Sequence, residues 1–528
     1  MQLPALVSSL LAMTMVLVPL DDRPVTAQLP QLLGAIAGAR VVEPPRPLLG
    51  HDLVPGDADA ILRWLRDEAP AGASDVVAST DMTMYGGLVA SRIPGVSLDV
   101  ARTRLQELAA IREARGGSFT AFGTVMRLAP TGVPAIGKAA SFPFAGDVWP
   151  LLQRYANLPD PPRTEEQRAE AERLRARLGP NLRAYLDTRA RDRDADLAAL
   201  RLTAEGRFDR MVLGQDDAGP AGLHVRDLAA LRAFAARWIP AGRARIEPGA
   251  DELGMVLIGA ALARHAGIVP RVRVVYSRPD GASVQDPIEF APIDVTIGDL
   301  IATCGGARTN AGDAAIDLFV RVPDTAAPHE AAFVDAIAAD VARGRLAAVA
   351  DLSFLGDPPY AVQRRLTEEL IARGIAARIA AFASWNTTAN TVGTALPEAI
   401  AVLAGRALGS YDARAHARFT LMRYVDDIAF HDDVRPRLNA DLSSAGVTDH
   451  TYLLPEVAQE TAAENRALLW REGLDLLNRI APQFRDAGFT ITLPWNRTFE
   501  TGLDLRLAPV PPPPSATEVP KSSPGLPG

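Results

Sequence analysis

Short apolar runs alternate with longer helical stretches along most of this chain. The apolar runs lie near residues 15–20, 39–43, 75–80, 120–127, 209–215 and 244–247, and a second series follows at 271–276, 316–322, 347–352 and 377–384. Stretches rich in Ala, Leu and Arg, such as residues 100–115 and 164–190, lie between them. Because parallel strands need helical crossovers, this alternation predicts a parallel α/β protein.

The 528 residues exceed what a single hydrophobic core usually serves, so several structural units are expected. We predict a (β/α) barrel-like catalytic unit over residues 15–268, a smaller second α/β unit over 269–402, and a mainly helical segment over 403–508 that packs back on them. The strand count does not distinguish a closed barrel from two open sheets. Residues 1–14 are predicted to be an N-terminal extension, and the Pro-rich residues 509–528 a disordered tail.

Polar residues, most of them acidic, follow four of the apolar runs at the points where the strands are predicted to end. The carboxyl ends of parallel strands carry the ligand sites of α/β proteins, so we expect these side chains to form one site. Two adjacent carboxylates at a buried strand end need a strong compensating reason, which makes Asp216 and Asp217 the leading catalytic candidates. The residues after the four runs are Asp21, Asp22 and Arg23; Asp81; Gln215, Asp216 and Asp217; and Asp251 and Glu252.

Several of these groups also have purely structural explanations. Residues 21–23 could form an internal ion pair, and residues 251–252 could be acidic residues at a helix N-terminus, favoured by the helix dipole. Tyr85 precedes two glycines that suit a tight turn. Asp426-Asp427 and His431-Asp432-Asp433 have a helical context, which favours a solvated face.

Two groups in the second half combine tryptophan with amide or arginine side chains. Trp385, Asn386 and Asn390 follow the run at 377–384, and Trp495-Asn496-Arg497 lies near the end of the chain. Helix capping explains some of the polar residues but not the tryptophans. An indole face beside carboxamides suits the apolar face and the hydroxyls of a sugar. We therefore predict a carbohydrate site whose binding residues are Asp21, Asp22, Arg23, Asp81, Tyr85, Gln215, Asp251, Glu252, Trp385, Asn386, Asn390, Trp495, Asn496 and Arg497.

Composition narrows the classes of partner. The net charge of −8, without a basic stripe, argues against nucleic acid. After residue 20 no run is long and apolar enough to cross a membrane. The single cysteine, Cys304, excludes disulfides within the chain and thiolate metal clusters. Lysine occurs only at positions 138 and 521 and there is no Walker-type loop, so we expect no cofactor.

These observations predict a cytoplasmic protein with a small carbohydrate as its partner. The apolar N-terminus leaves secretion as an alternative. The sequence does not define the oligomeric state.

Six segments, taken together, resemble a bacterial family catalogued as domain of unknown function 4127. The resemblance runs in order from residue 16 to about 505. It implies no reaction, but it supports treating residues 1–14 and 509–528 as additions to the shared unit. The segments are Val18–Pro24, Asp81–Arg92, Gln215–Asp217, Pro248–Glu252, Trp385–Thr394 and Leu493–Glu500.

A second resemblance concerns mechanism. The apolar strand ending in Asp216-Asp217 is similar to the catalytic Asp-Asp of retaining β-N-acetylhexosaminidases that use substrate assistance, and Trp385-Asn386 is similar to residues that line their sugar pocket. In that chemistry the 2-acetamido oxygen attacks the anomeric carbon, so no carboxylate nucleophile is needed. The resemblance implies that Asp216 holds the acetamido group and Asp217 is the general acid and base. Repulsion between adjacent acids separates their pKa values, which suits this division.

We therefore expect a glycoside hydrolase, a retaining exo-β-N-acetylhexosaminidase-like enzyme without a metal. Two alternatives stay open. The clustered carboxylates could instead ligate a hard divalent cation such as Mg²⁺ in a metal-dependent hydrolase. The protein could also be a non-catalytic carbohydrate-binding protein.

Overall fold

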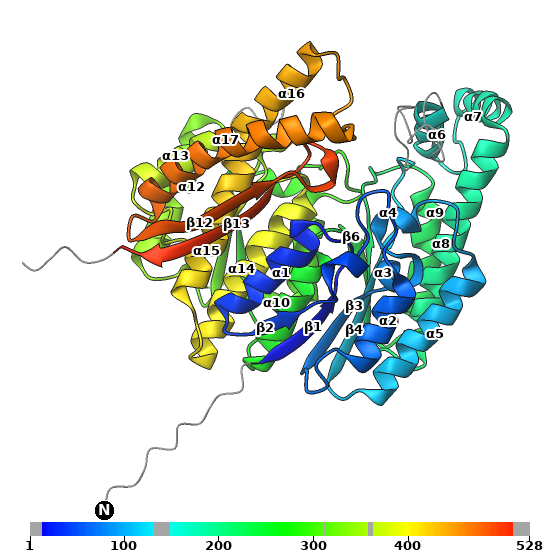
Figure 1. Ribbon diagram of the computed structural model, residues 1–528, viewed down its shortest axis with the longest axis horizontal. Helices are drawn as coiled ribbons and strands as arrows, with labels where there is room; N and C mark the ends of the chain where they lie inside the picture. Colours follow the sequence, from blue (N-terminus) through cyan, green and yellow to red (C-terminus); the bar gives the residue numbers. More distant parts are fainter. Residues whose placement is uncertain (1–12, 131–147, 311, 357–362, 511–528) are drawn as a thin grey trace, which may run out of the picture.

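The computed structural model describes residues 13–130, 148–310, 312–356 and 363–510 (Figure 1). Its strands form two separate open sheets and one antiparallel hairpin. The predictions for residues 1–12 and 511–528 lie outside the described residues, as do both lysines. The first sheet contains β1 (Thr14–Val18), β2 (Arg40–Val42), β3 (Asp75–Ser79), β4 (Ser118–Val125), β5 (Arg210–Gln215) and β6 (Ala244–Pro248); the second contains β7 (Arg271–Tyr276), β8 (Ala307–Arg308), β9 (Ile316–Arg321), β10 (Leu346–Asp351) and β11 (Ala381–Ala383); the hairpin joins β12 (Phe484–Thr492) and β13 (Gly502–Pro509).

The first sheet has the strand order β2-β1-β3-β4-β5-β6, and every neighbouring pair in it is parallel. Its two edge strands, β2 and β6, do not pair with each other, so the barrel predicted for residues 15–268 is wrong. The physical reason lies in the order of the strands. The chain adds β2 on one side of β1 and β3 on the other, so helices cover both faces, as in doubly wound proteins.

The second sheet repeats this arrangement in the order β11-β10-β9-β7-β8, again with parallel pairs. Its first strand, β7, also lies between the second and third strands of its own series. Both sheets therefore have a topological switch point at their carboxyl edge, where ligands bind in open α/β sheets. The sequence shows no matching internal repeat.

Helices surround and separate the two sheets (Figure 1). Side-chain caps begin several of them; for example, Thr164 and Gln167 form a reciprocal capping box at α7. Gly179 divides the predicted helix over 164–190 into two. The α-helices are α1 (Leu29–Ile36), α2 (Ala58–Asp67), α3 (Thr80–Tyr85), α4 (Leu88–Ser91), α5 (Leu98–Ala114), α6 (Val148–Ala156), α7 (Glu165–Leu178), α8 (Pro180–Ala204), α9 (His224–Trp238), α10 (Leu253–His265), α11 (Ile293–Thr303), α12 (Ala327–Ala342), α13 (Gln363–Ala372), α14 (Thr388–Leu408), α15 (Ala413–Arg423), α16 (Arg435–Ser444) and α17 (Pro455–Ile480).

The hydrophobic core has a central layer between the two sheets. Along β1, Met15 and Leu17 face this layer, whereas Val16 and Val18 face the helices on the other side, as the period of two in a strand requires. The central layer also contains residues of α1, α10, α11 and α14, together with the inner faces of β7, β9, β10 and β11. Separate cores cover the outer face of each sheet.

The C-terminal segment packs on the outer face of the second sheet. It contains α15, the π-helix η6 (Tyr424–Val434), α16, α17 and the hairpin, drawn in red in Figure 1. The segment was predicted to be mainly helical, and the hairpin is an addition to that prediction. Asp427 and His431 are buried in η6 rather than on a solvated face. The Asp427 carboxylate accepts a hydrogen bond from Ser384 N and pairs with Arg423, which compensates its burial.

No helix within the described ranges combines the length and the apolar character needed to cross a bilayer.

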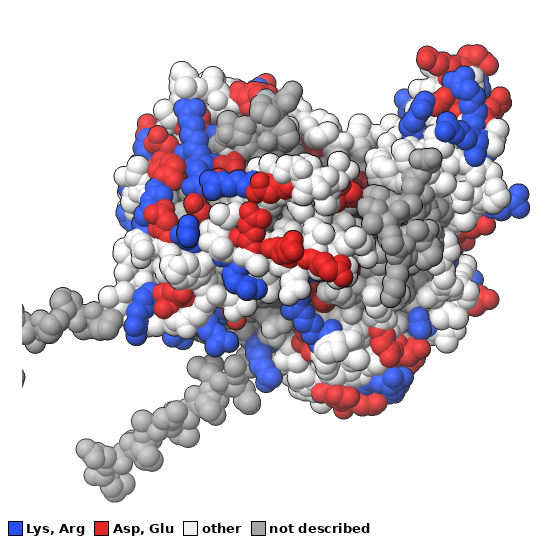
Figure 2. Space-filling model, turned by 45° about the horizontal axis from the view of Figure 1, so that its top comes forward, with Lys and Arg blue, Asp and Glu red and all other residues white. Residues whose placement is uncertain are grey.

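Acidic and basic side chains are interspersed on the face drawn in Figure 2.

Candidate functional site

A cavity of about 340 Å³ lies among loops that follow the carboxyl ends of strands from both sheets. This volume is within the range typical of small-molecule sites. The loops after all six strands of the first sheet contribute to the cavity, and the second sheet contributes those after β7 and β11. The C-terminal segment completes the wall with Thr451, Trp495, Arg497 and Phe499. The polar and aromatic lining residues include Arg23, Asp52, Arg92, Arg127, Trp149, Gln215, Asp216, Asp217, Asp251, Glu289, Asn386, Asn390, Trp495, Arg497 and Phe499.

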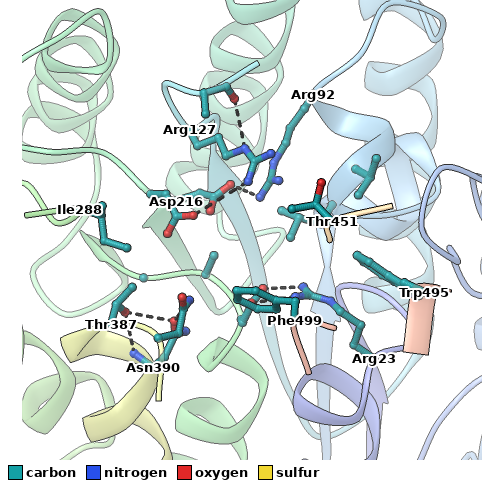
Figure 3. Close-up of a pocket in the computed structure, with 18 of the residues that line it drawn as sticks. Arg23, Arg92, Arg127, Asp216, Ile288, Thr387, Asn390, Thr451, Trp495 and Phe499 are labelled. Carbon is teal, nitrogen blue, oxygen red and sulfur yellow. Dashed lines mark hydrogen bonds and ion pairs between the residues drawn. The ribbon is translucent and has the colours of Figure 1, made fainter. Parts of the chain in front are cut away.

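Asp216 is the first residue after β5, and it forms a buried ion pair with Arg92. The two side chains are 7% and 6% exposed, so the pair is largely shielded from water. The backbone N–H of Asp216 donates to Val125 O at 3.2 Å, which fixes the carboxyl end of β5 against β4. Figure 3 shows Arg92 and Arg127 on the same side of the cavity as Asp216, with Thr387 and Asn390 across from them.

Asp217 has a different environment from its neighbour. Its side chain is 40% exposed in the cavity, and its nearest cation is Arg127, with Nη1 3.9 Å from Oδ2. Burial raises the pKa of Asp217 to about 7, and repulsion from Asp216 adds to the increase, although Arg127 and Arg92 oppose it. The adjacent acids therefore differ in charge compensation and in access to the cavity.

Arg23 joins the loops after β1 and β6. Its guanidinium donates to Asp21 Oδ2 at 2.7 Å and to both oxygens of Asp251, at 2.6 and 2.9 Å. Burial alone would raise the pKa of Asp251, but the attraction of Arg23 outweighs it and the pKa lies below its ordinary value. The internal ion pair expected for residues 21–23 is thus present. It extends to Asp251 on the cavity wall.

Trp495 packs against this ion pair. Its indole Nε1–H donates to Asp22 Oδ1 at 2.7 Å. The guanidinium groups of Arg23 and Arg497 both lie over its ring, 4.6 and 4.7 Å from the centroid. The indole is 4% exposed, so its faces stack on cations within the protein.

The start of α14 forms the wall that comes from the second sheet. Thr387 caps the helix by accepting from Asn390 N at 3.1 Å. Asn390 Nδ2 donates to the buried Glu252 at 2.7 Å, and Asn386 Nδ2 donates to Asn390 Oδ1 at 2.6 Å. Ala389 N donates to Glu289 Oε1 at 2.6 Å. Burial raises the pKa of Glu289 to about 8, and repulsion from Asp286 contributes.

The structure brings most of the predicted site residues together. Some of them line the cavity, and others lie behind the lining residues. Asp21, Asp22 and Glu252 lie behind the wall and contact residues that form it. Asn496 is exposed and lies outside the cavity lining. The predicted residues that line the cavity are Arg23, Gln215, Asp216, Asp217, Asp251, Asn386, Asn390, Trp495 and Arg497.

Three predicted residues are buried away from the cavity lining. Asp81 accepts from Thr124 N at 2.8 Å, and burial raises its pKa to about 7. Tyr85 is in the core and precedes Gly86, whose φ of 93° ends α3 in the left-handed conformation that was predicted as a turn. Trp385 is 6% exposed, packs in the central core and donates through Nε1 to Thr394 at 3.1 Å. It has no free face toward the cavity for the predicted sugar contact.

Of the polar and aromatic lining residues named above, six were not predicted: Asp52, Arg92, Arg127, Trp149, Glu289 and Phe499. Arg127 is the last residue of the run at 120–127 and lies just beyond β4, so its place near a strand end could be predicted but its role could not. Arg92 ends one of the family segments. In a chain whose basic residues are almost all arginine, one more arginine carries little signal. Trp149 is in the first turn of α6, and Asp52, Glu289 and Phe499 lie in loops; none of them has a local sequence pattern that marks it.

No group of three or more His, Cys, Asp or Glu side chains is arranged to hold a metal ion in the parts of the chain that the structure describes.

The fold and the site define an α/β protein with a polar cavity between two open, doubly wound sheets. Over residues 15–504 the chain matches the family described as "Protein of unknown function (DUF4127)", and it belongs to that family. Comparison with curated proteins and with solved structures gave no match.

Proposed function

We propose that this protein is a glycoside hydrolase that cleaves N-acetyl-β-hexosaminides by a substrate-assisted mechanism. The observation that carries the proposal is the contrast between Asp216 and Asp217. The two acids are adjacent at the end of β5, yet one is buried in an ion pair with Arg92 and the other is open to the cavity.

Asp217 has the properties of a general acid. Its pKa of about 7 keeps a large part of the group protonated near neutral pH, which is the range in which proton transfer is efficient. Its partial exposure in the cavity gives a leaving-group oxygen access to the proton. In the second step the same carboxylate would accept a proton from the attacking water.

Asp216 suits the other role. Its Oδ2 is used by Arg92, and no hydrogen bond to Oδ1 is found among the described residues. This oxygen can accept the N–H of a 2-acetamido group and orient the acetamido oxygen toward the anomeric carbon. The Asn386 amide on the wall can serve a sugar hydroxyl, whereas the amides of Gln215 and Asn390 are engaged within the protein. Stacking would fall to Trp149, since the rings of Trp495 and Phe499 each already contact two arginines.

The test is hydrolysis of aryl N-acetyl-β-glucosaminides by single variants. Asp217→Asn should reduce kcat by about 10²–10⁴-fold with poor leaving groups and much less with activated ones, because activated aryl groups leave with little protonation. Asp216→Asn should slow every substrate, since the acetamido group is no longer oriented. A thiazoline analogue of the cyclic intermediate should inhibit the wild type. Asp67→Asn, an exposed acid on α2, is the matched control and should leave kcat unchanged.

Chelation separates this proposal from the metal-dependent alternative. Substrate assistance needs no cation, so activity should survive EDTA. Loss of activity on chelation with recovery by Mg²⁺ or Mn²⁺ would favour a metal-dependent hydrolase. Absence of turnover with retained sugar binding would favour a carbohydrate-binding protein.

A further inference from the structure

Four arginines line the cavity, and three of them are hydrogen-bonded to carboxylates. Arg23 pairs with Asp21 and Asp251, Arg92 with Asp216, and Arg497 with Glu500. Arg127 differs from these three. Among the described residues its nearest carboxylate is Asp217, at 3.9 Å, which is beyond hydrogen-bonding distance.

The guanidinium of Arg127 is held in place by backbone contacts. Its Nε–H donates to Ala129 O at 3.1 Å, which leaves the two Nη groups for other partners. The loop that carries it is fixed as well: Arg189 Nη1 donates to Arg127 O at 2.7 Å, and Leu128 N donates to Asp217 O at 3.3 Å. A pair of Nη groups on an anchored guanidinium matches the two oxygens of a carboxylate.

The charge balance around Arg127 is also incomplete. Arg92 is close enough to repel it, and the negative charge of Asp216 is already shared with Arg92. Burial lowers the pKa of Arg127 to about 10, and Arg92 lowers it further, although Asp216 and Asp217 oppose this. Whenever Asp217 carries the proton needed for catalysis, its negative charge is absent. Among the described residues, the cavity then contains an arginine without an anionic partner, which is costly unless a ligand supplies one.

We infer that the sugar recognised in this cavity carries a carboxylate, and that Arg127 binds it through its two Nη groups. The inference rests on the proposed function and narrows its substrate class from N-acetylhexosaminides in general to acidic N-acetylhexosamines. A bound carboxylate next to Asp217 would also favour the protonated form of that acid, because like charges repel. Substrate binding would thereby help to keep Asp217 protonated.

Calorimetric titration with two sugars that share a ring tests this inference. N-acetylglucosamine is neutral, and N-acetylmuramic acid carries a carboxylate on a 3-O-lactyl group. The wild type should bind the acid at least about tenfold more tightly, the range expected for charge-assisted hydrogen bonds. Arg127→Gln should reduce this preference to within about twofold, and Arg127→Lys should retain part of it. Arg66→Gln, on the exposed face of α2, is the matched control and should keep the wild-type preference.

Equal binding of the two sugars by the wild type, no binding of either, or a preference that survives in Arg127→Gln would overturn the inference. Competition by inorganic phosphate at the same concentration as the acid sugar would overturn the assignment to a carboxylate. The two proposals fail separately. Preferred, Arg127-dependent binding of the acid without turnover of any aryl glycoside would refute the hydrolase and leave the anion subsite. Turnover of neutral glycosides without a preference for the acid sugar would support the hydrolase and refute the anion subsite.

Discussion

Replacing Arg23 by methionine tests whether the ion pair behind the cavity is a structural support. Arg23 is the shared partner of Asp21 and Asp251, and the three side chains are 4%, 2% and 12% exposed. Removing the cation leaves two shielded carboxylates without a counter-charge, while methionine keeps most of the apolar stem. Breaking a buried pair in this way typically costs about 3–5 kcal/mol. We therefore expect the free energy of unfolding to fall by about that amount.

Urea denaturation at pH 7, followed by far-UV circular dichroism, measures the loss. Arg66→Met removes an arginine that is 45% exposed and pairs with Asp67 and Glu107, so its effect should stay within about 0.5 kcal/mol. Adding Asp251→Asn to Arg23→Met removes one of the two unpaired carboxylates, so the free energy of unfolding should recover by at least about 1 kcal/mol. A loss below about 1 kcal/mol in Arg23→Met, or no recovery in the double variant, would refute the electrostatic explanation.

Three further predictions concern pH and packing. If Asp217 is the proton donor, its pKa of about 7 predicts that kcat for poor leaving groups falls as the pH rises above 7, and Asp217→Asn should lose this limb. Burial raises the pKa of Glu398 to about 8, so its contribution to stability is present at low pH and is lost as the pH rises toward 8. The free energy of unfolding should therefore decline between about pH 6.5 and 8. Glu398→Gln should reduce that decline, measured by urea midpoints, by at most about 1.4 kcal/mol per pH unit. A Cβ at Gly393 would lie 2.8 Å from Glu252 Cβ, whereas one at Gly298 in α11 would meet open space. Gly393→Ala should therefore cost about 1–3 kcal/mol, and Gly298→Ala should be neutral or stabilising by up to about 1 kcal/mol, so equal midpoints would contradict the packing argument.

The strands were predictable because their signal is local. Apolar runs such as 209–215 and 316–322 match β5 and β9 closely, since a buried parallel strand requires a continuous apolar segment. Strand order is not local, and it is the order that separates an open sheet from a barrel. The two-residue β8 is too short to give any pattern.

The candidate site could be predicted in part for the same reason. Asp216, Asp217 and Asp251 follow strands, and the edge shared by parallel strands brings them to one cavity. Trp385 also follows a strand, but whether its indole faces the cavity or the core depends on the packing of α14, which no local pattern encodes. The role of Arg127 could not be predicted, because it depends on which carboxylates lie near the guanidinium in the folded protein.

The apolar layer between the sheets opposes a hinge motion of one sheet relative to the other. The helices α10 and α14 belong to different halves of the chain but bury their side chains in the same core. Moving the two sheets apart would expose that layer to water, so any change in access to the cavity would come from its loops rather than from the sheets. For the same reason a fragment ending at residue 268 would carry a bare apolar face, and it would aggregate instead of folding as a separate half.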